Sequence, residues 1–90
     1  MRVALFCHDK DGALQVRLDN RTAHLAHIEN SGVVELAGPL LNPKGQMTGS
    51  LIVLNVDRLQ DAKDWAAADP YAKAGLFQSV TITEWKKVIG

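Results

Sequence analysis

The stretch Ser50-Leu51-Ile52-Val53-Leu54-Asn55-Val56 carries the strongest strand signal in this chain of 90 residues. Successive side chains of a β-strand point to opposite faces of the sheet, so a strand with one wet face alternates apolar and polar residues. In this stretch, large apolar residues occur both among the residues that point to one face of the sheet and among those that point to the other. We therefore expect this strand to lie within a sheet that is covered on both faces.

Segments with a secondary-structure pattern flank this strand on both sides. They are a strand over residues 2–7, a helix over 14–31, a strand over 33–37, a helix from 57 to about 68 and a strand over 77–85. The order β-α-β-β-α-β is typical of a ferredoxin-like α+β fold, in which a four-stranded antiparallel sheet carries both helices on one face. The other face stays bare, and an apolar face of this size is an association surface. We expect a homodimer in which two sheets pack face to face.

Composition limits the classes of function. The chain is long enough for one domain over residues 1–90, with 47% hydrophobic and 22% charged residues, as in ordinary globular proteins. Ten basic and ten acidic residues cancel without a basic stripe, so we expect no nucleic-acid partner. No stretch approaches the roughly 20 apolar residues of a membrane-spanning helix. Cys7 is the only cysteine, which suits a reducing compartment and predicts a cytoplasmic protein.

One residue disturbs the pattern of the first helix. Apolar residues recur on one helical face at Leu14, Leu18, Leu25 and Ile28. Arg21 projects onto the same face, where an unpaired charge would be costly. Two arrangements avoid this cost. In the first, the helix breaks near Asn20, which would be the N-cap of a second segment, and Arg21 is solvated. In the second, Arg21 faces a polar pocket and has a carboxylate or an anionic substrate as its partner.

Two further residues could form a proton-transfer pair. His24 lies in Arg21-Thr22-Ala23-His24-Leu25, and Asp69 precedes Pro70, which pushes it out of the helical region onto a turn. A histidine titrates near neutral pH, and a carboxylate beside it can fix its tautomer and strengthen it as a base. Each residue also has a structural explanation, namely a helix histidine held by one hydrogen bond and an Asp-Pro turn.

Other polar residues are weaker candidates for contact with a ligand. Ser50 starts the central strand and could equally make a turn hydrogen bond, and Tyr71 could present its hydroxyl or simply pack. The run Cys7-His8-Asp9 holds three potential metal ligands. Alternation along a strand sends Cys7 and His8 to opposite faces, so we expect no metal site there.

Taken together, these motifs resemble the YCII-related (YciI-like) family of small bacterial proteins. The matching marks are the short first strand, Arg21 with His24-Leu25, Gly38-Pro39, Gly49-Ser50, and Asp69-Pro70-Tyr71 with Ala74-Gly75. The resemblance spans nearly the whole chain and implies a dimeric α+β barrel of ferredoxin-like subunits, with His24 and Asp69 as the active pair. It also associates the chain with lyase chemistry on halogenated hydroxy-aromatic compounds. The segment between Pro39 and Gly49 is short compared with many relatives.

The leading functional hypothesis is an enzyme of the lyase or isomerase type that needs no cofactor. In it, His24 moves a proton on a small cyclic or anionic substrate, and Asp69 accepts a hydrogen bond from the imidazole. The substrate contacts would come from Arg21, Ser50, Tyr71, Gly38 and Pro39. The alternatives are a small-molecule-binding dimer without turnover, and a structural dimerisation unit whose polar residues only satisfy buried hydrogen bonds.

Overall fold

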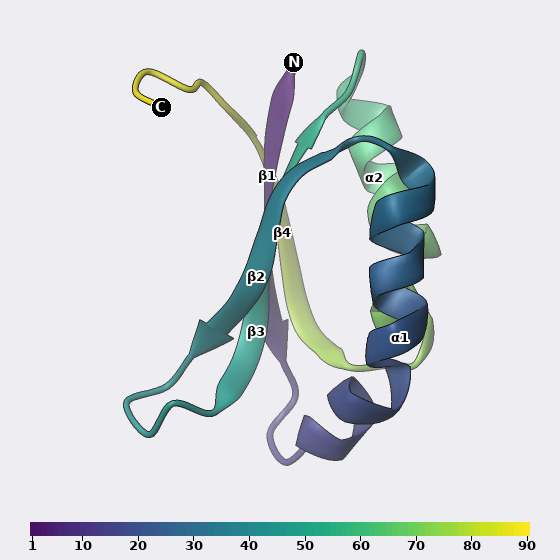
Figure 1. Ribbon diagram of the computed structural model, residues 1–90, viewed down its shortest axis with the longest axis vertical. Helices are drawn as coiled ribbons and strands as arrows, with labels where there is room; N and C mark the ends of the chain where they lie inside the picture. Colours follow the sequence, from purple (N-terminus) through teal and green to yellow (C-terminus); the bar gives the residue numbers. More distant parts are fainter.

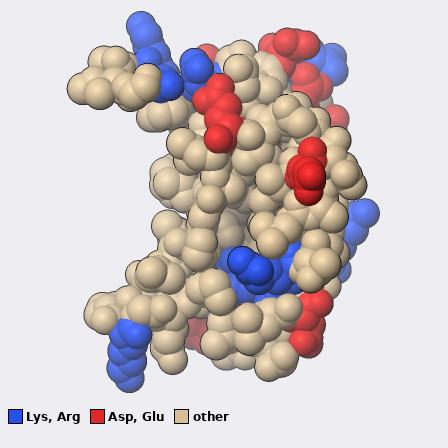
Figure 2. Space-filling model, viewed as in Figure 1, with Lys and Arg blue, Asp and Glu red and all other residues tan.

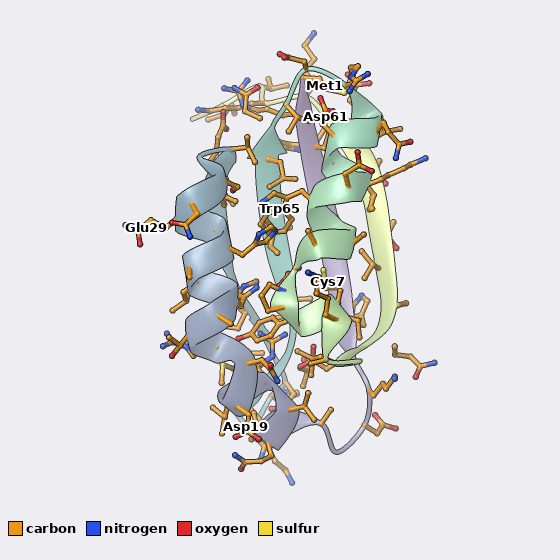
Figure 3. All side chains as sticks on the ribbon, turned by 90° about the vertical axis from the view of Figure 1, so that its right-hand side faces the viewer. Met1, Cys7, Asp19, Glu29, Asp61 and Trp65 are labelled. Carbon is orange, nitrogen blue, oxygen red and sulfur yellow. The ribbon has the colours of Figure 1, made fainter.

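One antiparallel sheet of four strands forms the frame of the computed structural model, which describes residues 1–90 (Figure 1). The elements in chain order are β1 (Arg2–Asp9), α1 (Leu14–Ser31), β2 (Val34–Leu41), β3 (Met47–Asn55), α2 (Leu59–Ala68), α3 (Pro70–Lys73) and β4 (Phe77–Trp85). The strands lie in the order β2-β3-β1-β4, so β2 and β4 are the edges. The helices α1 and α2 cover the same face of the sheet (Figure 1 and Figure 3). The expected ferredoxin-like arrangement is confirmed, and the single-turn helix α3 is an addition to it.

The core lies between this face of the sheet and the helices. The central strands β1 and β3 supply most of it, because alternate residues of each strand point toward the helices. The buried apolar side chains of this cluster are Val3, Leu5 and Cys7 of β1, Ile52 and Leu54 of β3, Val56, and Ala62 and Trp65 of α2. Gly49 permits the close pairing of β1 and β3, since a Cβ atom there would overlap the carbonyl oxygen of Cys7.

The first helix is continuous, so the alternative with a break near Asn20 is wrong. The Asn20 side chain does not cap a second helical segment. Its amide instead donates a 2.9 Å hydrogen bond to the carbonyl oxygen of Val16, one turn earlier. The helix ends at Gly32, whose φ of 67° lies in the left-handed region that glycine adopts readily.

The buried face of α1 is not the apolar stripe that the sequence predicted. The three leucines of that stripe, at positions 14, 18 and 25, are 40%, 47% and 43% exposed. The buried residues of the helix are Arg17 and His24. These polar side chains can occupy the buried positions because β1 and α3 supply partners for them. None of the helices has the length and apolar character needed to cross a membrane.

The strand β2 continues through Gly38 and Pro39, beyond the strand over residues 33–37 that the sequence predicted. Pro39 pairs with Ser50 in the β2–β3 ladder. Proline lacks an amide hydrogen, and an edge strand such as β2 tolerates that loss because one of its sides has no neighbouring strand. A turn follows β2, and the Asn42 side chain accepts two backbone hydrogen bonds within it.

The face of the sheet opposite the helices is apolar and uncovered. A hollow of about 270 Å³ on this face is lined by Ala4, Phe6, Leu36, Leu51, Val53 and Trp85. Apolar side chains of β3 therefore point to both faces, Ile52 and Leu54 toward the helices and Leu51 and Val53 toward the open side, and the expected cover over the open side stays a prediction. The C-terminal tail and the β2–β3 hairpin project beyond this side of the molecule (Figure 1).

Candidate functional site

A cavity of about 180 Å³ lies between α1 and the part of the sheet formed by β2 and β3. Its polar lining residues are Arg17, Arg21 and His24 of α1, Ser50 of β3 and Tyr71 of α3. Its other lining residues are Leu25, Ile28, Ala37, Gly38, Pro39, Met47 and Ile52. Basic atoms lie at the surface between the sheet and the lower part of α1 (Figure 2).

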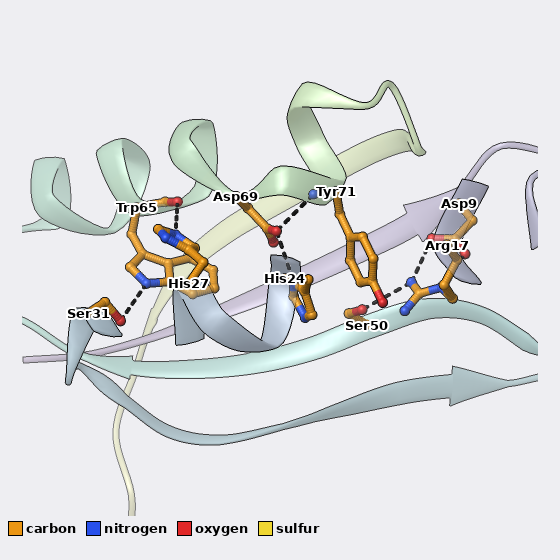
Figure 4. Close-up of polar contacts among 9 residues, drawn as sticks. All are labelled: Asp9, Arg17, His24, His27, Ser31, Ser50, Trp65, Asp69 and Tyr71. Carbon is orange, nitrogen blue, oxygen red and sulfur yellow. Dashed lines mark hydrogen bonds and ion pairs between the residues drawn. The ribbon is translucent and has the colours of Figure 1, made fainter. Parts of the chain in front are cut away.

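His24 and Asp69 are hydrogen bonded, with 2.8 Å between Nδ1 and Oδ1 (Figure 4). Their side chains are 7% and 2% exposed. Asp69 is the N-cap of α3, and the same Oδ1 accepts a 3.0 Å hydrogen bond from the backbone N–H of Tyr71. Because the turn holds the carboxylate in this position, Asp69 favours the tautomer of His24 that carries its hydrogen on Nδ1. In the neutral ring, Nε2 then has a free lone pair.

Nε2 of His24 is open to the cavity. His24 is one of the lining residues, and Nε2 makes no hydrogen bond within the chain. Every fully buried side-chain nitrogen and oxygen of the protein has a hydrogen-bond partner. Nε2 is therefore not fully buried, and the imidazole presents a proton acceptor at the cavity wall.

Tyr71 packs directly against this imidazole. The rings of Tyr71 and His24 are stacked, with their centroids 3.9 Å apart and an angle of 12° between the planes. On the other side of the tyrosine ring, the guanidinium carbon of Arg17 lies 4.8 Å from the ring centroid. Burial raises the pKa of the Tyr71 hydroxyl, and the nearby charges of Arg17 and Arg21 oppose part of that rise. The hydroxyl is therefore protonated at neutral pH and can donate a hydrogen bond.

Arg17 forms a buried ion pair with Asp9, the last residue of β1. The distances from Nε to Oδ2 and from Nη2 to Oδ1 are both 2.8 Å, and the two side chains are 3% and 6% exposed. Nη2 also donates a 3.1 Å hydrogen bond to Oγ of Ser50. Burial opposes the charge of Arg17, but the hydrogen bonds and charge of Asp9 outweigh it and raise the pKa of Arg17 above its usual value. Arg17 is thus a permanent cation in the cavity wall.

The structure brings together the residues that the sequence singled out. His24 contacts Asp69. The other predicted contact residues, Arg21, Ser50, Tyr71, Gly38 and Pro39, all line the cavity. Arg21 lines the cavity from a continuous helix, but it is also exposed, and no carboxylate of the chain forms an ion pair with it.

Sequence reasoning missed Arg17 and Asp9, although a signal for both was present. Arg17, Arg21 and His24 are spaced by four and three residues, which places them on one face of α1. Asp9 continues the series of residues 3, 5 and 7, whose buried side chains point from β1 toward the helices. A charged residue at an inward-facing position of each of two adjacent elements indicates a buried ion pair.

Comparison with known proteins assigns the chain to a family. The model of the YCII-related domain matches residues 1–86. The chain belongs to the YCII-related family. Protein YciI of an Escherichia coli O6:H1 strain is 35% identical over 97 residues, which cover 98% of this chain and 99% of that protein. An uncharacterized protein of Haemophilus influenzae is 36% identical with the same coverage.

Solved structures similar to this YCII-related protein include enzymes. The 5-chloro-2-hydroxyhydroquinone dehydrochlorinase of Burkholderia phenoliruptrix, in complex with 2,5-dihydroxybenzoquinone, is 33% identical. The match covers 96% of this chain and 94% of that chain, with a TM-score of 0.87. An antibiotic biosynthesis monooxygenase is 10% identical, with 98% of each chain covered and a TM-score of 0.61, and it shares the fold alone. Because one fold hosts several chemistries, the function must be argued from the site.

Proposed function

We propose that this YCII-related protein is an acid–base enzyme of the lyase type that needs no cofactor and acts on a small ring bearing oxygen substituents. The observation that carries the proposal is the hydrogen bond between His24 and Asp69, together with the free Nε2 at the cavity wall. In this mechanism Nε2 takes a proton from the substrate. Asp69 is a positioning residue, because it holds the imidazole in one tautomer and stabilises the imidazolium that forms.

The cavity limits the size and charge of the substrate. An engineered protein cavity of about 150 Å³ holds one benzene molecule, so a cavity of about 180 Å³ suits one six-membered ring with small substituents. Arg17 and Arg21 place positive charge in its wall, which favours a ring with acidic or anionic oxygens over a neutral hydrocarbon. The similar dehydrochlorinase is named for a substrate of this kind, which supports the same class here.

Elimination of HCl is a reaction that these residues can catalyse. A base removes a proton from the substrate, and chloride leaves with the electron pair of the carbon–chlorine bond. The net loss is one proton and one chloride, so no external oxidant or reductant takes part. A general base typically contributes about 10² to 10⁴ in rate, and fixed hydrogen-bond donors stabilise the negative charge that develops.

Chloride release from 5-chloro-2-hydroxyhydroquinone tests this proposal. We expect turnover by the wild type and a loss of at least about 100-fold in His24→Gln, which removes the base. The matched control is His27→Gln, since His27 lies on the same helix, one turn away, outside the cavity lining. It should retain wild-type activity. Full activity in His24→Gln would rule the proposal out.

The role of Asp69 has a test that does not depend on the substrate. In Asp69→Ala the Nδ1 hydrogen of His24 loses its acceptor, so the imidazole is released to the Nε2–H tautomer that a neutral ring prefers in water. Nitrogen-15 NMR of the ring distinguishes these tautomers. We expect the Nδ1–H tautomer in the wild type and the Nε2–H tautomer in the variant. The same tautomer in both would show that Asp69 does not control the ring.

A second candidate function is binding of a small molecule without turnover. It is supported by the largely apolar remainder of the cavity lining, which suits a ligand as well as a substrate. Saturable binding of 2,5-dihydroxybenzoquinone without any chloride release would favour this function. A purely structural role for His24 predicts instead that His24→Ala lowers stability by roughly 1–3 kcal/mol.

We further propose that the protein is a homodimer formed through its open sheet face. Phe6, Leu36 and Trp85 are 40%, 51% and 41% exposed there, and every residue of the hollow between them is apolar. Contact between two such faces removes this apolar surface from water, at roughly 25 cal/mol for each Å² buried. The product is the dimeric α+β barrel that the family resemblance implies.

A further inference from the structure

We propose that Arg17, held in place by Asp9, binds the negatively charged oxygen that develops on the substrate. This inference rests on the proposed function, because it assigns a role within the same cavity. Arg17 lies outside the motifs on which the family resemblance is based. Its position follows from the packing of α1 against β1 and β3.

Three residues with hydrogen-bond donors line the cavity together with His24. The Nε and Nη2 atoms of Arg17 are engaged with Asp9 and Ser50, whereas Nη1 has no carboxylate partner. The Ser50 hydroxyl accepts from Arg17, and its own hydrogen has no acceptor within the chain. Burial raises the pKa of the Tyr71 hydroxyl, so this group keeps its proton at neutral pH and is the third donor. All three residues line the cavity and follow one another along it next to His24 (Figure 4).

Asp9 fixes Arg17 from outside this cavity. Two parallel hydrogen bonds of 2.8 Å hold the plane of the guanidinium, and the face of Tyr71 packs against it. Asp9 is not among the residues that line the cavity. The residues that carry the free donors therefore line the cavity, while the compensating carboxylate lies outside it. Donors fixed in this way stabilise developing charge effectively, because they need no reorganisation during the reaction.

The proposed step accounts for each electron pair. The step starts from the keto tautomer of the ring, in which the carbon that bears chlorine also bears hydrogen. Nε2 of His24 forms an N–H bond as a ring O–H bond breaks, and the oxygen that is left with a negative charge faces Arg17, Ser50 and Tyr71. The electron pair of this oxygen forms a C=O bond, the adjacent ring C=C pair shifts to the C–Cl carbon, and chloride leaves with the electron pair of the carbon–chlorine bond. The ligand class is therefore a six-membered ring with an ionisable oxygen conjugated to the carbon that loses chloride.

Comparison of two ring ligands tests this inference by calorimetry at pH 7. The first is 2,5-dihydroxybenzoquinone, an acidic hydroxyquinone, and the second is hydroquinone, a neutral ring of similar size. The variant is the double replacement Asp9→Asn/Arg17→Met, which leaves no unpaired charge in the interior. The matched control is Lys63→Met, which removes an exposed positive charge from α2. A cooperative thermal unfolding transition is required of each protein as the check that it is folded.

We expect the double variant to bind the hydroxyquinone roughly 10- to 150-fold more weakly, which is the effect of losing a hydrogen bond to a charged group. Its affinity for hydroquinone should change less than about threefold, because a neutral ligand has no charge for Arg17 to stabilise. Lys63→Met should leave both affinities unchanged. Asp9→Asn alone should give a smaller loss for the hydroxyquinone, since Arg17 keeps its charge but loses part of its orientation.

Three results would overturn the inference. They are an unchanged affinity of the double variant for the hydroxyquinone, an equal loss of affinity for both ligands, and no saturable binding of the hydroxyquinone by the wild type. The first two leave the acid–base function standing if His24→Gln still abolishes chloride release. Failure of the proposed role of Arg17 can therefore be distinguished from failure of the proposed acid–base function of His24.

Discussion

Replacing Arg17 by Met removes a cation from the interior and leaves its partner behind. The Asp9 side chain is only 6% exposed, and each of its oxygens would lose a hydrogen bond of 2.8 Å. The flexible Met side chain fills most of the space of the Arg stem, so lost packing contributes little. The variant therefore isolates the cost of an unpaired buried carboxylate.

Two limits set the size of this cost. Breaking a buried ion pair by removing one partner typically costs about 3–5 kcal/mol. The carboxylate can avoid this by binding a proton, which for an ordinary aspartic acid with a pKa of about 3.9 costs about 4 kcal/mol at pH 7. We expect Arg17→Met to lower the free energy of unfolding by about 3–4 kcal/mol at pH 7. For a domain of this size that corresponds to a fall in Tm of about 12–30 °C. At pH 5 protonation is easier, and the loss should shrink to about 1.5 kcal/mol.

Urea unfolding followed by the fluorescence of the buried Trp65 measures this loss. The control is Arg21→Met, one turn further along α1, which removes a cation without an ion pair and should change stability by less than about 0.5 kcal/mol. Asp9→Asn/Arg17→Met should recover at least about half of the loss, since no buried charge is left. A loss below about 1 kcal/mol in Arg17→Met at pH 7, or an equal loss at both pH values, would refute the reasoning.

Three further predictions concern the sheet. Gly49→Ala should lower the free energy of unfolding by about 1–3 kcal/mol, because the added Cβ would overlap the carbonyl oxygen of Cys7. At Gly38 an added Cβ meets open space, so the control Gly38→Ala should change the free energy of unfolding by less than about 0.5 kcal/mol. Equal urea midpoints for these two variants would contradict the close approach of β1 and β3. Burial raises the pKa of the Cys7 thiol to about 12, so above about pH 9 the unfolded state releases this proton while the folded state keeps it. Above this pH, the free energy of unfolding of the wild type should fall more steeply than that of Cys7→Ala, by up to about 1.4 kcal/mol per pH unit. Parallel curves of stability against pH for the two proteins would contradict this prediction. Phe6→Glu places a charge on the open sheet face and should convert the proposed dimer to a monomer in sedimentation, and an unchanged dimer would exclude this face as the interface.

Local patterns were sufficient for much of the fold. The apolar runs of β1 and β3, the helical spacing of α1 and the β-branched residues of β4 predicted the type and order of the main elements. Asp69 was predicted to leave the helical region because a residue before proline is sterically restricted, and it has a φ of −61° and a ψ of 126°. These predictions hold because they depend on residues within a few positions of one another.

The sequence by itself determined the β-α-β-β-α-β order, the apolar character of both faces of β3, and His24 and Asp69 as candidates. Only the tertiary structure decided which face of α1 is buried, since the leucine stripe and the stripe of Arg17 and His24 are both compatible with helical periodicity. A buried charge is stable only where another element supplies its partner. The partners here are remote: His24 and Asp69 are 45 residues apart, and Arg17 and Ser50 are 33 apart. Periodicity shows that a helix has faces, but the position of a distant carboxylate decides which polar face can be buried.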